Sequence, residues 1–68
     1  MTPHSFREWR KGLGYSQQEA ADALGISRSS VELYEAGRRR GADARPVEIP
    51  KTIALACAAV SRGLEPLA

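Results

Sequence analysis

Helix start and stop signals in the middle of the chain constrain its fold more than any other feature. The run Ser16-Gln-Gln-Glu19 is a capping box, in which the serine and glutamate side chains satisfy free backbone N–H groups. It opens a short, alanine-rich helix, Gln17 to Leu24, which Gly25 closes. A second helix, Arg28 to Ala36, is stopped by Gly37. These signals predict two short helices joined by a tight turn.

Apolar residues at helical spacing predict one further helix on each side of this pair. The first helix, about Pro3 to Gly12, has one face formed by Phe6, Trp9, Arg10 and Leu13. The last helix, about residues 50–62, has an apolar repeat formed by Ile53, Ala56, Cys57 and Val60. Pro50 suits the first position of that helix. With no strand pattern in the chain, we expect an all-α fold of four to five helices in a single domain, residues 1–68.

Composition argues against several classes of protein. The 68 residues include one histidine, His4, and one cysteine, Cys57, so we expect no metal site, no cofactor and no disulfide. Cys57 lies in an apolar stretch, where a buried, inert thiol is a better interpretation than a nucleophile. Neither a membrane span nor a signal peptide is predicted, so a cytoplasmic location is expected. A net charge of +2 is weak evidence for nucleic-acid binding by itself. The core of a 68-residue chain is small, so the fold needs very good packing or a partner subunit.

Side-chain size at fixed offsets makes the central pair a helix-turn-helix candidate, over about residues 17–36. Ala21 must be small because the second helix crosses it closely, and Gly25 must accept a left-handed backbone. The positions expected to face the core hold Leu24, Ile26, Val31 and Tyr34.

Three runs carry a family resemblance: Leu13-Gly-Tyr-Ser-Gln17, Ala23-Leu-Gly-Ile-Ser27 and Tyr34-Glu-Ala-Gly37. With them the chain resembles the Cro/C1-type (phage-repressor-like, XRE) helix-turn-helix proteins, closely over Phe6 to Gly37 and more loosely over the last helix. The resemblance implies an all-α domain that binds double-stranded DNA in the major groove, usually as a two-fold dimer at a palindromic operator.

In the phage-repressor pattern the second helix of the motif enters the groove and touches base edges. The resemblance therefore implies five base-contacting residues: Arg28, Ser29, Ser30, Glu32 and Leu33. The Arg28 guanidinium can bond guanine O6 and N7 together, with a phosphate contact as the alternative. Glu32 can accept from cytosine N4, although an i, i+4 pair with Arg28 is favoured. Leu33 lies off the core stripe, so it suits a thymine methyl or packs at the periphery of the monomer.

Two groups of residues are expected at the DNA backbone. The resemblance implies phosphate contacts at Ser16 and Gln17, where a helix start favours an anion, and capping by Ser16 is compatible with this role. The loop after the second helix carries Arg38, Arg39, Arg40 and Arg45. These four arginines against one aspartate give residues 36–46 a net charge of +3, more than the whole chain carries. A solvated loop without DNA contacts is the alternative, and the loop is longer than the family leads us to expect.

Two further expectations concern folding and assembly. Arg10 and Glu35 match a partly buried ion pair of the family, so we expect them to have a structural role without contacting DNA. The last helix is apolar nearly all round, which is more than the core can cover. The unexplained residues are expected in a two-fold homodimer interface: Leu55, Ala59, Leu64 and Leu67.

The sequence thus predicts a sequence-specific, double-stranded DNA-binding transcriptional regulator. We expect a repressor that binds a palindromic operator as a dimer, with no membrane association and no small-molecule substrate. A protein-interaction or antitoxin-like module of the same fold is the first alternative, although the arginine loop counts against a purely protein-binding role. An enzyme is the second alternative and is not expected, because Glu19 and Asp22 lack the spacing of a metal-dependent nuclease site.

Overall fold

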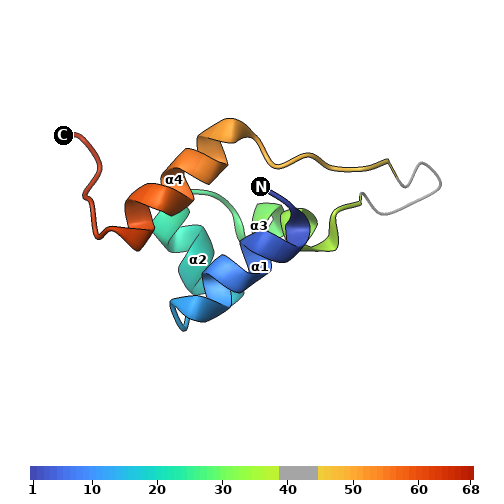
Figure 1. The fold of residues 1–68 in the computed structure, drawn as a ribbon, viewed down its shortest axis with the longest axis horizontal. Coiled ribbons are helices and arrows are strands. Elements are labelled where there is room, and N and C mark those ends of the chain that lie inside the picture. The colour runs from blue at the N-terminus through green and yellow to red at the C-terminus, as the bar shows by residue number, and fades with distance from the viewer. Residues whose placement is uncertain (39–44) are drawn as a thin grey trace.

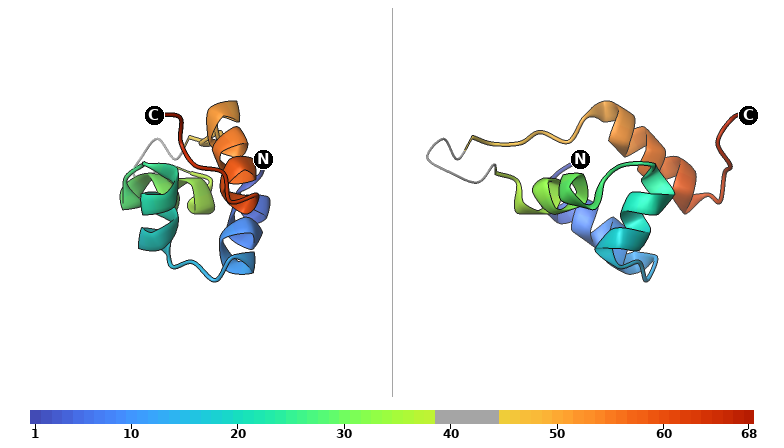
Figure 2. Two further views of the ribbon diagram at one scale, coloured as in Figure 1. Left: turned by 90° about the vertical axis from the view of Figure 1, so that its left-hand side faces the viewer. Right: turned by 180° about the vertical axis from the view of Figure 1, so that it is seen from behind.

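The computed structural model of the chain describes residues 1–38 and 45–68. Four helices form in these residues, in chain order α1 (Pro3–Gly12), α2 (Gln17–Leu24), α3 (Arg28–Ala36) and α4 (Lys51–Ser61). The described residues contain no strand, and the all-α prediction is confirmed. In the left view of Figure 2, α1 and α4 lie on one side of the molecule and α2 and α3 on the other, with the helices labelled in Figure 1. None of the helices in residues 1–38 and 45–68 has the length and apolar character needed to cross a membrane.

Hydroxyl side chains begin the first three helices. At α1 the Thr2 Oγ1 accepts a hydrogen bond from the Ser5 backbone N–H at 3.0 Å, and the Thr2 N–H donates to Ser5 Oγ at 2.8 Å. At α3 the Ser27 Oγ accepts from the Ser30 N–H at 3.1 Å. These caps satisfy N–H groups that have no partner within the helix. α4 is different, because it begins at Lys51 without a side-chain cap.

The start of α4 differs by one residue from the prediction. Pro50 is the N-cap residue, with φ −59° and ψ 149°, rather than the first helical residue. The fixed φ of proline suits both positions, and the extended ψ places it just outside the helix.

Gly25 makes the turn between α2 and α3. It adopts a left-handed conformation, with φ 71° and ψ 31°, and its N–H bonds the carbonyls of Ala21 and Asp22. The next N–H, that of Ile26, also reaches the Ala21 carbonyl, at 3.0 Å. This pattern closes α2 and redirects the chain at once, so that α3 packs across α2.

The core cluster holds one buried residue from each helix, Phe6, Ala21, Val31 and Cys57, and Ala20 of α2 is buried as well. Partly buried side chains surround it: Trp9, Leu24, Ile26, Tyr34, Ile49 and Ile53. Burial raises the pKa of the Cys57 thiol to about 11, so the thiol is neutral and behaves as a small apolar group.

Trp9 ties α1 to α4 across this core. Its indole N–H donates to the Cys57 carbonyl at 3.0 Å and to Ser61 Oγ at 2.9 Å. The indole ring also packs against Phe6, with ring centroids 5.5 Å apart. α4 is therefore held against α1 by hydrogen bonds as well as by apolar packing.

Candidate functional site

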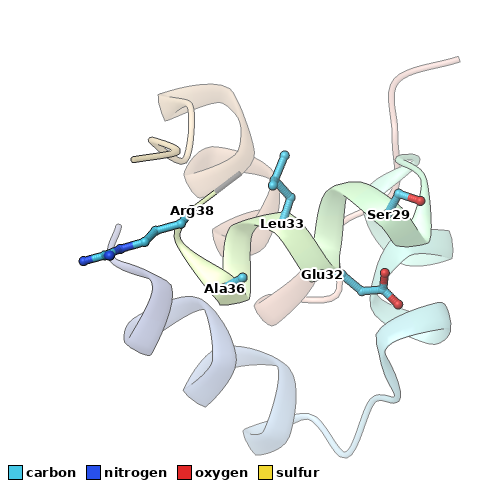
Figure 3. A pocket seen from close by; sticks show the side chains of 5 residues that line it. All are labelled: Ser29, Glu32, Leu33, Ala36 and Arg38. Carbon is cyan, nitrogen blue, oxygen red and sulfur yellow. The ribbon is translucent and has the colours of Figure 1, made fainter. Parts of the chain in front are cut away.

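One face of α3 lines an open hollow at the surface of the protein. Ser29, Glu32, Leu33 and Ala36 are spaced i, i+3, i+4 and i+7, so they share one helix face. Together with Arg38 they line an open hollow of about 310 Å³ (Figure 3). The opposite face of the helix is buried, through Val31 and Glu35. One short helix thus packs into the core on one side and presents side chains to solvent on the other.

An ion pair lies at the edge of this hollow. Arg28 Nε donates to Glu32 Oε1 at 3.2 Å, one turn further along the helix. Both side chains are exposed, so the pair contributes roughly 0.2–0.5 kcal/mol to the helix. The bond holds the Arg28 guanidinium near the start of α3 and neutralises the negative charge of the Glu32 carboxylate beside the hollow.

Ser30 does not join this face. It is half-buried, and its hydroxyl lies 3.0 Å from the Ser27 hydroxyl that caps α3. Its side chain therefore belongs to the helix start, whereas Ser29 faces the hollow. Ala36 lines the hollow as well and is missing from the sequence-based set; counting seven residues from Ser29 along the same face would have found it.

The start of α2 carries the predicted Ser16 and Gln17. Ser16 is committed to the capping box: its N–H donates to Glu19 Oε1 at 2.9 Å, and its Oγ accepts from the Glu19 N–H at 3.1 Å. The hydrogen bonds from the Ser16 backbone and hydroxyl lower the pKa of the Glu19 carboxyl. Gln17 is half-buried in the first turn, while the neighbouring Gln18 side chain bonds Asp22 at 3.0 Å.

The predicted arginine loop is described only at its two ends. Arg38 and Arg45 are exposed, and an antiparallel bridge between Arg38 and Pro46 brings the two ends together. The Val47 N–H reinforces it by bonding the Gly37 carbonyl at 3.0 Å. The predicted phosphate contacts Arg39 and Arg40 lie outside the described residues.

Behind the exposed face, the structure brings Arg10 and Glu35 together in a bidentate ion pair. Arg10 Nε donates to Glu35 Oε2 at 2.7 Å and Nη2 donates to Oε1 at 3.0 Å. Arg10 Nη1 donates to the Tyr15 carbonyl at 2.9 Å, which includes the α1–α2 turn in the network. The hydrogen bond to Glu35 raises the pKa of the Arg10 guanidinium, and the side chains are only 14% and 7% exposed.

Sequence reasoning missed a second arginine at this pair. Arg7 Nη2 donates to the Glu35 backbone carbonyl at 3.2 Å, and Arg7 Nε lies 3.7 Å from Glu35 Oε1. The signal was available, because Arg7 precedes Arg10 by three residues on one helix and such residues are neighbours.

The four residues expected in a dimer interface all lie in α4 or in the tail that follows it. Ala59 and Leu64 line an open groove of about 270 Å³ between α2 and the end of α4, opposite Ala23 and Leu24. Leu55 is 61% exposed and does not line the groove.

The last of the four, Leu67, is fully exposed in the tail that follows α4. In Figure 1 that tail leads away from the helices.

No group of three or more His, Cys, Asp or Glu side chains in residues 1–38 and 45–68 is arranged to hold a metal ion.

Comparison with known proteins agrees with the geometry of α2 and α3. A sequence model of the helix-turn-helix family matches residues 6–43, which is more than half of the chain. No curated protein and no solved structure matches the chain in the other two comparisons. The match begins in α1 and extends beyond α3. It therefore includes both residues of the Arg10–Glu35 ion pair and the whole exposed face of α3.

Proposed function

The chain belongs to the Cro/C1-type (XRE) helix-turn-helix family and is a DNA-binding regulator of that type, and on this premise we propose that it is a repressor that binds a palindromic operator. The binding would be specific for sequence in double-stranded DNA and would block access of the polymerase to a promoter. We expect such a repressor to act in the cytoplasm. No cofactor, small-molecule substrate or enzymatic step enters the proposal.

The exposed face of α3 is the observation that carries it. In phage-repressor-like proteins the second helix of the motif lies in the major groove. Here that helix has a buried inner face and an outer face lined by Ser29, Glu32 and Leu33. Ser29 and Glu32 are exposed and Leu33 is half-buried, so a base edge can reach this face.

The roles of the flanking residues follow from their positions. We assign base contacts to Arg28, whose planar fork matches guanine O6 and N7, and to the residues of the outer face. Ser30 is a weaker candidate, because its hydroxyl already pairs with Ser27. We assign phosphate contacts to the start of α2, at Ser16 and Gln17, where N–H groups of the first turn favour an anion.

The loop arginines complete the backbone contacts in the proposal. Arg38 lines the hollow, and Arg45 directly precedes Pro46, the bridge partner of Arg38, so we assign both to the DNA backbone beside α3. Arg39 and Arg40 lie between them in the sequence and are assigned the same role on charge alone.

A homodimer would place two copies of α3 in successive major grooves about 34 Å apart. We propose that its interface uses the apolar surface of α4 and the tail, with Leu55, Ala59, Leu64 and Leu67 as contacts. Leucine side chains that are more than half exposed favour such a surface over a monomer in water. Sedimentation should show a dimer at tens of micromolar, and a monomer at that concentration would contradict this part of the proposal.

The experiment for DNA readout is selection of binding sites from random DNA, followed by footprinting. A palindromic consensus is expected, and Arg28→Ala should remove the preference for it while weak, salt-sensitive binding to any DNA remains. Arg62→Ala is the matched control, because it removes the same charge from an exposed position after α4. Equal binding of operator and random DNA by the wild-type protein would overturn the proposal.

One observation favours a second candidate, a protein-interaction or antitoxin-like module. The groove between α2 and α4 is lined mainly by apolar residues, including Leu24, Val60 and Leu64. Such a groove suits a helix or strand of another protein. Gel shifts on genomic fragments decide between the candidates, because a purely protein-binding module would retard none of them.

A further inference from the structure

We infer that the hollow on α3 reads the C5-methyl group of a thymine in the major groove, with Leu33 and Ala36 as the residues that detect it. This inference deepens the proposed function and rests on it. The ligand is one base edge of double-stranded DNA, and the discriminating feature is a single methyl group.

In the apolar part of the hollow Leu33 is half-buried and Ala36 is exposed, and neither residue belongs to the core cluster. Val31 is fully buried and Tyr34 packs against the core, whereas Leu33 and Ala36 turn to the other side of α3. Figure 3 shows Leu33 projecting from the upper edge of α3 and Glu32 from its lower edge, with the short Ala36 side chain about one turn along the helix from Leu33. A leucine and an alanine one turn apart leave a recess in which a methyl group makes contact without displacing a side chain.

The polar part of the hollow fits the rest of a thymine edge. In the major groove thymine presents its methyl group next to one acceptor, O4. Ser29 lines the same hollow and carries a hydroxyl donor that can satisfy that acceptor.

The carboxylate of Glu32 would repel a phosphate, but its bond to Arg28 balances the charge. A guanine edge suits the hollow poorly, because it offers two acceptors and no methyl group to the apolar recess.

The test removes the methyl group and nothing else. Once a selected operator is known, each thymine is replaced in turn by deoxyuridine, and binding is measured by fluorescence anisotropy. At the position that faces the hollow, deoxyuridine should weaken binding roughly three- to fivefold for each half-site, the worth of one buried methyl group. At the same position, 5-methylcytosine should bind more tightly than cytosine by a similar factor, since they differ by that methyl alone.

A protein variant assigns the effect to the residue. With Leu33→Ala, thymine and deoxyuridine should bind equally at the sensitive position, because the methyl group loses its partner. Leu13→Ala is the matched control: it truncates a partly exposed leucine at the end of α1 and should leave the discrimination unchanged. Circular dichroism establishes that both variants are folded, and the ratio of two affinities is unaffected by a partly unfolded fraction.

The outcomes separate this inference from the proposed function. A selected consensus with no thymine sensitive to deoxyuridine refutes the inference and leaves DNA recognition standing. A sensitive thymine whose discrimination persists in Leu33→Ala also refutes it, because another residue then reads the methyl group. Failure of the selection to enrich any sequence refutes the proposed function, and the inference falls with it.

Discussion

Replacing Arg10 with methionine is expected to destabilise the fold more than any surface substitution in the chain. Methionine keeps the length and apolar stem of the arginine, so the change removes the guanidinium and little else. It deletes two charged hydrogen bonds to Glu35, at 2.7 and 3.0 Å, and one to the Tyr15 carbonyl, at 2.9 Å. Glu35, which is 7% exposed, would retain Arg7 as its partner, with Arg7 Nε 3.7 Å from Oε1.

The expected loss of unfolding free energy follows from the Glu35 carboxylate that remains. Removing one partner of a buried ion pair costs about 3–5 kcal/mol, since the remaining charge is neither solvated nor paired. Arg7 is 45% exposed and offers partial compensation, which points to the lower end, about 3 kcal/mol. A chain of 68 residues has a total stability on the order of 3–10 kcal/mol. The variant should therefore be marginally folded at room temperature.

Urea denaturation followed by Trp9 fluorescence measures this loss, because Trp9 lies between α1 and α4 and changes environment on unfolding. The double variant Arg10→Met with Glu35→Leu should recover most of the stability, since it removes the stranded carboxylate as well.

Arg28→Met is the control, because it breaks an exposed ion pair at 3.2 Å and should cost about 0.5 kcal/mol or less. A loss below about 1 kcal/mol for Arg10→Met, or a double variant as unstable as the single one, would refute the reasoning.

Three further predictions follow from the backbone, from a cap and from the core. Gly37→Ala should destabilise the protein by about 2–3 kcal/mol, because φ is +72° and the added Cβ would lie 2.9 Å from Pro3 Cγ; Gly25→Ala, with φ +71° and open space, should cost only about 1–2 kcal/mol in the same urea titration. The pKa of Glu19 is lowered in the folded state, so its stabilisation is present above the unfolded carboxyl pKa and is lost as pH falls through the folded one. Thermal melts of Glu19→Gln should therefore vary less with pH in the acid range than those of the wild type, and identical pH profiles would contradict this. The Cys57 thiol, with its pKa raised to about 11 by burial, should react with a disulfide reagent at pH 8 only when the protein unfolds, at a rate that rises with urea; rapid labelling without urea would contradict this.

The helices were predictable because their signals are local. The capping box at Ser16 and the glycines at 25 and 37 act within a few residues, so the bounds of α2 and α3 can be obtained from sequence alone. The start of α4 was less certain, because Pro50 can occupy either of two adjacent positions with the same φ.

The candidate site was only partly predictable, for a physical reason. Which side chains share the outer face of α3 is fixed by helical period, so Ser29, Glu32 and Leu33 could be placed there before the structure was known. What Ser30 and Arg7 do depends on hydrogen bonds to other groups, and several partners compete for each of them. Residue spacing alone does not show which hydrogen-bond partner is chosen. The net free energy of one such bond is small, and burial in the folded protein decides between the partners.

The two faces of α3 also separate stability from recognition. A helix of nine residues is too short to be stable alone in water, where about 12–15 residues are needed. The outer face therefore exists as a shaped surface only while Val31 and Glu35 hold the inner face against α1 and α2. A substitution on the inner face lowers the folded fraction, so it weakens binding to operator and to random DNA by the same factor. A substitution on the outer face, such as Leu33→Ala, leaves the folded fraction nearly unchanged and alters the ratio of the two affinities. Measuring that ratio together with unfolding free energy thus distinguishes a residue that reads DNA from one that supports the helix that reads it.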